Sequence, residues 1–184
     1  MLRVWDGHQR SSCQAKKRYF MSVDMHPSEQ DLYFLRKTFA LAEQTKAQGL
    51  HPFAAIVVDA DGNIVTEAGN NSLPPTGDPT RHAETVAAGQ AARLKSLKEL
   101  RTCTLYTNAE PCAMCAGAIY WTGIGRVVYG MSEKKLLSIT GDHPENPTLS
   151  LPCRTVFASG QRGIEVIGPC LSEEAAVAHQ GFWQ

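Results

Sequence analysis

The apolar run Ala54–Val58 is the feature that most limits how this chain can fold. A second β-rich run follows it, and Asp61-Gly62 between the two is a signal for a hairpin turn. Because Ala54–Val58 contains no polar residue, we expect this strand to be buried on both of its faces. A sheet covered on both faces needs helices on either side, which predicts an α/β fold.

Helical and strand patterns alternate along the rest of the chain. Ser28-Glu29-Gln30-Asp31 resembles a capping box, although Asp stands where Glu or Gln is usual, and Gly49 is placed to end the helix that follows. Apolar residues recur at helical spacing in that helix, at Leu32, Leu35, Phe39 and Ala42. The pattern further predicts helices over about 81–99, 112–121, 132–138 and 172–182, and strands over about 102–107, 126–129 and 163–167.

This order of elements predicts a three-layer α/β/α sandwich around a five-stranded mixed sheet. Residues 70–80 and 140–160 are rich in Asn, Pro and Gly, so we expect loops there. Ser172 is the expected cap of the last helix. A chain of 184 residues has room for one domain and a tail. Since residues 1–26 show no clear periodicity, we expect a loosely attached extension there and a single domain over 27–184.

Composition narrows the class of protein. The 18 basic and 18 acidic residues give zero net charge, which argues against a nucleic-acid partner without excluding a local basic patch. No apolar run approaches the ~20 residues needed to cross a bilayer, so we expect no membrane association. No apolar segment follows the basic residues near the start, as a secretory signal requires, so we expect a cytoplasmic protein. Six cysteines are too few for a disulfide scaffold, so the C-x-x-C pair is more typical of a metal-binding or redox-active site.

Two short motifs, RHAE at 81–84 and EPCAMC at 110–115, carry groups that bind metals. Cys112 and Cys115 are spaced i, i+3 at the start of an expected helix, so they face the same way where thiolates are favoured. Such a pair fits Zn²⁺, whose bonds to sulfur are about 2.3 Å long. Two sulfurs do not complete a tetrahedral ion, and His82, at another helix start, is the candidate for the third ligand.

Three protein ligands leave one position open, which separates a catalytic zinc from a structural one. Water in that position has its pKa lowered to about 7. Glu84, two residues after His82, is placed to take a proton as base and return it as acid. The spacing H-x-E…P-C-x-x-C also matches the signature of zinc deaminases, in which the glutamate acts without binding the metal.

The cysteine pair is also compatible with two further kinds of site. It could be a redox pair, but the surrounding pattern is not thioredoxin-like. It could be half of a four-ligand structural zinc site in an interaction module, but Cys13, Cys103, Cys153 and Cys170 form no second close pair. A structural site also has no use for a carboxylate beside an open position. The combination of HAE at a loop–helix junction with PCxxC at a helix start therefore favours catalytic zinc.

Residues 28–184 resemble the cytidine/deoxycytidylate deaminase superfamily. The resemblance lies in PFAAIVV, AGNNSLPPTGDPTRHAE and LYTNAEPCAMCAGAIYWTGIGRVVYG, and it is greatest to bacterial guanine deaminases, tRNA adenosine deaminases and fungal-type cytosine deaminases. It implies a five-stranded sheet between helices, a homodimer, and hydrolytic removal of an amine from a nucleobase or nucleoside. It also implies that His82, Cys112 and Cys115 bind Zn²⁺ and that Glu84 shuttles protons.

The resemblance further implies residues that contact the substrate. Asn70 matches an asparagine that hydrogen-bonds the ring, and Phe53 matches an aromatic residue that lines the pocket. Ala83 and Glu110 would act mainly through backbone groups near the ring. The alternative for Asn70 is a turn residue, and the alternative for Phe53 is packing in the core.

The resemblance leaves the ring that is deaminated open. Trp121 after Tyr120 and the loop residue Asp142 are similar to guanine deaminases, which favours guanine, although a plain turn aspartate accounts for Asp142 equally well. The end of the chain is similar to cytosine deaminases, in which C-terminal aromatic residues cover the pocket. Phe182 and Trp183 are the candidates for this role here, and packing of the terminal helix onto the core is the alternative for both. A tRNA adenosine substrate is a third alternative, disfavoured by zero net charge and an acidic last helix.

Overall fold

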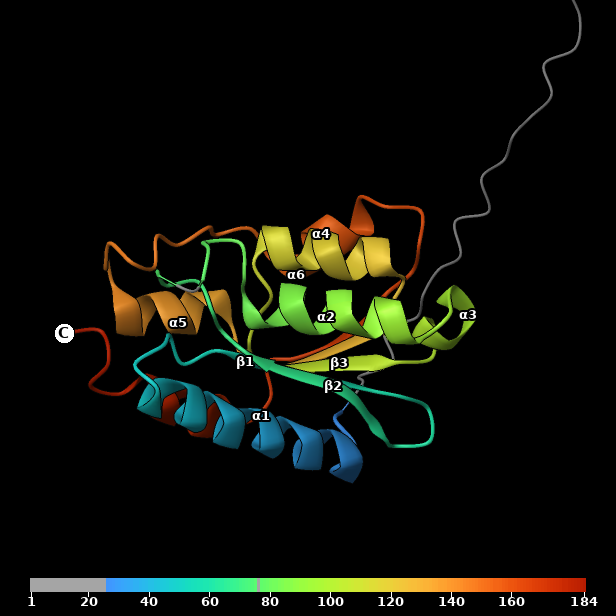
Figure 1. Cartoon of the computed structure of the whole chain (residues 1–184), viewed down its shortest axis with the longest axis horizontal. Helices are drawn as coiled ribbons and strands as arrows, with labels where there is room; N and C mark the ends of the chain where they lie inside the picture. The colour runs from blue at the N-terminus through green and yellow to red at the C-terminus, as the bar shows by residue number, and fades with distance from the viewer. Residues whose placement is uncertain (1–25, 76) are drawn as a thin grey trace, which may run out of the picture.

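The computed structural model describes residues 26–75 and 77–184 (Figure 1). In chain order its elements are α1 (Glu29–Ala47), β1 (Ala54–Val58), β2 (Ile64–Gly69), α2 (Ala83–Leu94), α3 (Leu97–Leu100), β3 (Thr104–Ala109), α4 (Ala113–Thr122), β4 (Arg126–Met131), α5 (Glu133–Thr140), α6 (Cys153–Ala158), β5 (Glu165–Ile167), α7 (Ser172–Ala176) and the 3-10 helix η1 (Val177–His179). The expected extension over 1–26 lies almost wholly outside the described residues. Within them, no helix has the length and apolar character that crossing a membrane requires.

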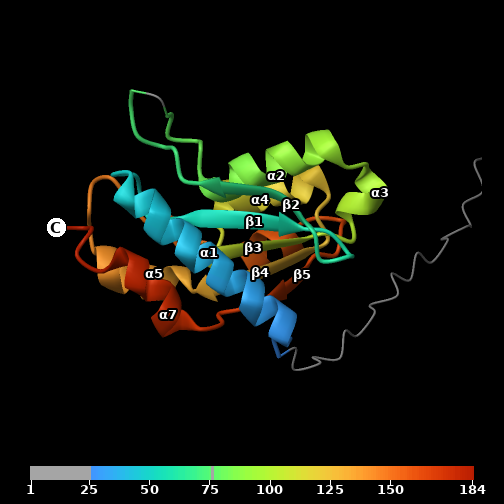
Figure 2. The same cartoon turned by 60° about the horizontal axis from the view of Figure 1, so that its bottom comes forward.

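The strands form one mixed sheet in the order β2-β1-β3-β4-β5. β1 is antiparallel to β2 and β3, whereas β4 is parallel to β3 and β5. Helices α1 and α7 cover one face of the sheet, and α2, α4 and α6 cover the other (Figures 1 and 2). All five residues of β1 are buried. The three-layer sandwich predicted from the apolar run is therefore confirmed.

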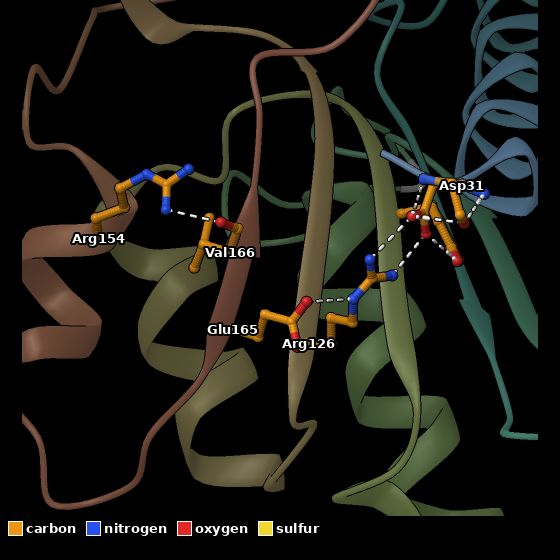
Figure 3. A network of polar contacts seen from close by, with 7 residues as sticks. Asp31, Arg126, Arg154, Glu165 and Val166 are labelled. Carbon is orange, nitrogen blue, oxygen red and sulfur yellow. Dashed lines mark hydrogen bonds and ion pairs between the residues drawn. The ribbon is translucent and has the colours of Figure 1, made fainter. Parts of the chain in front are cut away.

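Helix α1 begins at the predicted capping box. Ser28 accepts from the backbone of Asp31, and the Asp31 carboxylate accepts from the Ser28 backbone. The same carboxylate receives two hydrogen bonds from Arg126, at the start of β4, and one from Tyr106 in β3 (Figure 3). Arg126 also binds Glu165 in β5. A network centred on the buried Asp31 thus joins the first helix to three strands at one edge of the sheet.

Two expected helices differ in the structure. α2 ends at Leu94 rather than near 99, because Lys95 is extended and Ser96 starts α3 with a capping box of its own. The last helix is capped by Leu171 in a left-handed conformation (φ 56°) and not by Ser172. The Ser172 hydroxyl instead donates to the carbonyl of Gly130, 3.4 Å away. The hydrogen bonds that Ser96 and Ser172 make, rather than apolar periodicity, decide both boundaries.

The expected loop over 140–160 contains helix α6, which the sequence did not predict. Cys153 and Phe157 of this helix are buried in the core with α4. Arg154 donates to the carbonyl of Val166 on β5 at 2.7 Å (Figure 3). A helix of 6 residues is too short to show helical periodicity, so tertiary packing decides its formation.

The register of the strands brings the candidate motifs together. Ala54 pairs with Gly69, Ala55 with Thr107, and Ala109 with Met131. Residues just before β1 and just after β2, β3 and β4 therefore share one edge of the sheet. The helices α2 and α4 begin at this edge, which is on the left in Figure 1.

Candidate active site

Two helix starts hold the candidate metal ligands. His82 is the N-cap residue of α2 and Cys112 is the N-cap residue of α4, and neither side chain caps its own helix. Both side chains are therefore free to point toward a shared centre. Cys115, in the first turn of α4, is fully buried and faces the same centre.

The three donor atoms have the spacing of a tetrahedral metal site. The Nδ1 atom of His82 lies 3.7 Å from Sγ of Cys112 and 3.6 Å from Sγ of Cys115, and the two sulfurs are 3.5 Å apart. Ligands of a tetrahedral Zn²⁺, with bonds of about 2.0–2.3 Å, are separated by roughly 3.5–3.8 Å. Within 26–75 and 77–184, this is the one cluster of three His, Cys, Asp or Glu donors with such mutual proximity. The site therefore fits zinc.

The electrostatics of the cluster favour a deprotonated Cys112, whereas the hydrogen bond between the two sulfurs raises the pKa of the Cys115 thiol. A hydrogen bond with Cys115 lowers the pKa of the Cys112 thiol to about 4, and His82 adds to the effect. The hydrogen bond with Cys112 in turn raises the pKa of His82. A thiolate beside imidazole is the donor set that Zn²⁺ prefers.

Glu84 lies directly beside the cluster and is 4% exposed. One carboxylate oxygen, Oε2, is 3.5 Å from Sγ of Cys115. The other, Oε1, accepts a hydrogen bond from Oγ1 of Thr107 at 3.3 Å. Burial raises the pKa of Glu84, so this carboxyl group can hold a proton more readily than an exposed one.

Asn70 and Phe53 lie at the same edge of the sheet, where β2 ends and β1 begins. The backbone N–H of Asn70 donates to the carbonyl of Phe53 at 2.9 Å, and Asn70 is 2% exposed. Its Oδ1 accepts from the backbone and the hydroxyl of Ser72. No described residue hydrogen-bonds its Nδ2, so this donor is free for a ligand.

Aromatic side chains from the C-terminal segment pack over Phe53. The ring of His179 is 4.9 Å from that of Phe53, and the ring of Trp183 is 6.0 Å from it. Nε1 of Trp183 donates to Nδ1 of His179 at 3.1 Å. The segment after η1 thus forms one wall of the region around Phe53 and Asn70.

Comparison with known proteins agrees with this geometry. The family described as the zinc-binding region of cytidine and deoxycytidylate deaminases matches residues 28–131. The chain belongs to this family. It is therefore a hydrolytic, zinc-dependent deaminase of nucleobases or nucleosides, and a zinc-stabilised interaction module is set aside.

Individual relatives of the deaminase differ in the ring that their names state. A probable cytosine deaminase of Schizosaccharomyces pombe is 43% identical over 85% of this chain and 94% of its own length. The guanine deaminase of Bacillus subtilis is 41% identical over 52% of this chain and 61% of its own. A solved structure of NE0047 in complex with 2,6-diaminopurine is 27% identical, with a TM-score of 0.67 over 80% of this chain and 78% of that one. The structural match supports the cytidine deaminase fold.

Trp121 and Asp142, two expected substrate residues, occupy exposed positions in the deaminase. Trp121 is 76% exposed near the end of α4, about 13 Å along the helix axis from Cys112. Asp142 is exposed in the turn after α5. Because a helix carries its last turn away from its start, Trp121 is not placed to contact a ring at the metal cluster of the same chain. Asp142 is next to His143, whose ring is 5.4 Å from that of Trp183, and its role stays a prediction.

Two glutamates near the deaminase site have different surroundings. The carboxylate of Glu110 links the starts of α5 and α6, because it accepts from the backbone N–H of Glu133 and of Cys153. Burial raises the pKa of Glu133 to about 7, and the negative Cys112 adds to this. Glu133 was not among the residues expected from the sequence. Its position directly after β4, beside the end of β3, is the signal that could have indicated it.

Replacing Cys115 by alanine should remove zinc from the deaminase. The two remaining donors do not hold the ion tightly, because the protein then fills only two of the four tetrahedral positions. Metal analysis of the purified variant should show far less than one zinc per chain. Cys103→Ala is the matched control, since Cys103 is equally buried but lies outside the cluster. Full zinc content in Cys115→Ala would exclude this thiol as a ligand.

The buried His179 should make stability depend on pH between about 6.5 and 3. Burial lowers the pKa of His179 to about 3, whereas an unfolded histidine has a pKa of about 6.5. Below 6.5 the unfolded chain binds a proton that the folded chain does not, so the free energy of unfolding falls as pH falls. Urea unfolding at about pH 5 should show roughly 1.6 kcal/mol less stability than at pH 6.5 from this group. His179→Gln should lose this part of the pH dependence, and an unchanged slope would contradict the assignment.

Proposed function

We propose that this deaminase removes the exocyclic amine of a free nucleobase and that guanine is its preferred substrate. The observation that carries the proposal is the meeting of three groups at one edge of the sheet. These are the His82, Cys112 and Cys115 donor set, the buried carboxyl group of Glu84, and the amide nitrogen of Asn70, which no described residue hydrogen-bonds.

In the proposed reaction, Glu84 moves protons between water and the ring. His82, Cys112 and Cys115 would hold Zn²⁺, which would act as a Lewis acid and lower the pKa of water to about 7. Oε2 of Glu84 takes a proton from the attacking water, while Thr107 holds Oε1 in place. Glu84 then returns the proton to the substrate, the C–N bond breaks, and ammonia leaves. Water and the amino ring are thereby converted to the oxo ring and ammonia.

Asn70 and Phe53 are the proposed ring-binding residues. Nδ2 of Asn70 can donate to an acceptor on the ring, and a buried donor left unpaired by a wrong ring costs binding energy. Phe53 offers an aromatic surface beside His179 and Trp183. Ala83, fully buried between His82 and Glu84, is placed to contribute through its backbone, as Glu110 is at the end of β3.

Guanine and cytosine are the two candidate rings. The purine ligand of the NE0047 structure and the GAIYW stretch support guanine. The match over nearly the whole length of the fission-yeast relative supports cytosine as the second candidate. A tRNA substrate is the weakest candidate, because the chain has zero net charge and exposes Glu173 and Glu174 on α7.

Ammonia release from purified protein tests the proposal. The panel contains guanine, guanosine, cytosine, adenine and related aminated rings. We expect the highest kcat/KM with guanine. A higher value with cytosine would select the second candidate, and release from none of the free rings would overturn the proposal of a free nucleobase substrate.

A homodimer and a cytoplasmic location stay predictions. The exposed Trp121, with Met114 on the same helix, supports a contact between copies through α4, since large apolar side chains gathered on a surface often mark interfaces. Light scattering of the purified protein measures the mass in solution, and a mass near 20 kDa would contradict the dimer.

A further inference from the structure

We propose that His51 is a positioning residue that, through Ser72, sets the orientation of the Asn70 amide, with Glu145 as its counter-ion. The inference rests on the proposed function, because Asn70 must bind the ring for its orientation to matter. The sequence assigned no role to any of these three partners, although Ser72 lies within the stretch AGNNSLPPTGDPTRHAE.

The relay runs through three polar contacts in a line. Oε2 of Glu145 is 3.1 Å from Nε2 of His51. Nδ1 of His51 is 3.3 Å from Oγ of Ser72. Oγ of Ser72 donates to Oδ1 of Asn70 at 2.7 Å.

Counting protons gives each contact one direction. A carboxylate only accepts, so Nε2 of His51 must carry a hydrogen. Ser72 has a single hydroxyl proton, and it is used on Asn70. The Ser72 oxygen must therefore accept, so Nδ1 of His51 also carries a hydrogen. All three hydrogen bonds form together only when His51 is an imidazolium beside Glu145.

A neutral His51 would break the relay at Ser72. With a hydrogen on Nε2 alone, Nδ1 is an acceptor, and it would draw the Ser72 hydroxyl proton away from Asn70. Oδ1 of Asn70 would then keep only the backbone N–H of Ser72, at 2.9 Å. With the relay complete, a flipped amide would set Nδ2 against two donors. The relay thus keeps Oδ1 of Asn70 facing Ser72 and leaves Nδ2 of Asn70 to donate to the substrate ring.

The relay joins segments that lie far apart in the sequence. His51 precedes β1, Ser72 follows β2, and Glu145 belongs to the loop after α5. His51 is 4% exposed, and the rings of Trp183 and Phe182 pack at 5.1 and 5.9 Å from its own. The side chain of Glu145, 53% exposed, is therefore one point where the loop after α5 contacts this group of side chains, and His143, whose ring is 5.4 Å from that of Trp183, is another.

Kinetics of relay variants provide the first test, on the ring with the highest ammonia release. Ser72→Ala and Glu145→Gln should each raise KM about five- to tenfold, as expected for one lost hydrogen bond, with a smaller effect on kcat. The double variant should be no worse than the poorer single one, because both changes break the same chain. Ser72→Thr should restore KM, since it restores the hydroxyl donor.

Matched controls separate the relay from general effects. Ser138→Ala removes a hydroxyl that donates to a carbonyl on α5, and Glu173→Gln removes one charge of the exposed pair with Lys135. Both should leave KM unchanged. Additive effects of Ser72→Ala and Glu145→Gln, or equal losses in the controls, would overturn the relay.

Nitrogen NMR of the histidine rings provides a test that needs no substrate. If the three contacts form as the relay requires, His51 should show hydrogens on both ring nitrogens, and Glu145→Gln should remove the one on Nδ1. A neutral His51 in the unaltered chain overturns the relay whatever the activity shows. Absence of turnover on every ring with an imidazolium His51 would count against the proposed function and leave the relay standing.

Discussion

Replacing Glu84 by glutamine should slow ammonia release by about 10²–10⁴-fold, the usual contribution of a positioned general acid–base group. Glutamine keeps the size of the side chain and an oxygen for the Thr107 hydroxyl, but it cannot take a proton from water or return one to the amine. The loss should fall on kcat, because the ring contacts assigned to Asn70 and Phe53 are untouched. Steady-state kinetics with the best ring of the panel measures it.

Zinc content distinguishes the proton-shuttle role from a ligand role. Since the three-donor cluster does not include Glu84, the variant should retain one zinc per chain. Glu67→Gln, on the exposed side of β2, is the control for removing a carboxylate and should keep the normal rate. A normal rate in Glu84→Gln would show that the proposed mechanism is wrong, and a loss of zinc would show that Glu84 supports the metal instead.

Replacing Asp31 by alanine should lower the free energy of unfolding by about 3–5 kcal/mol, as is typical when one partner of a buried ion pair is removed. Asp31 is 2% exposed and lies 2.6 Å from Nη1 of Arg126. Without it, the guanidinium keeps Glu165 as its one acceptor among the described residues, and Tyr106 loses the acceptor of its hydroxyl (Figure 3). Urea unfolding at pH 7 measures the loss.

The location of the pair predicts that activity and stability respond separately. Arg126 begins β4, at the edge of the sheet opposite the metal cluster, so folded Asp31→Ala should retain its KM. The control is Glu174→Ala, which removes the exposed pair with Arg36 and should change stability little. An equal loss in both variants would contradict the importance of burial.

The same carboxylate makes a distinct contribution to acid unfolding. Burial by itself raises the pKa of Asp31, but hydrogen bonds from Arg126, Ser28 and Tyr106 outweigh it and hold the pKa well below its usual range. Because the folded pKa lies below the unfolded value of about 3.9, this stability is present above about pH 4 and is lost as pH falls further. The window therefore lies below most of the His179 window.

Local sequence predicted the elements whose signals are long or strongly apolar. The run Ala54–Val58 predicted a strand covered on both faces, and the box at Ser28 and Asp31 predicted the start of α1. The short helix α6 was missed, because its formation depends on Cys153 and Phe157 packing in the core. The sequence predicted the end of α2 at about 99 instead of Leu94, because no proline interrupts its alanine-rich pattern before Lys95.

The sequence alone determined the reaction, because metal chemistry demands particular donor types at particular spacings. His82, Cys112 and Cys115 lie on two helix starts, and any fold that aligns those starts brings the donors together. Tertiary structure decided the surroundings of the substrate. The relay is made by His51, Ser72 and Glu145, which lie on three separate segments with no sequence pattern that links them. The register of β1 with β2 and the path of the loop after α5 place them beside Asn70. Contacts between distant segments depend on packing, and no local pattern records them.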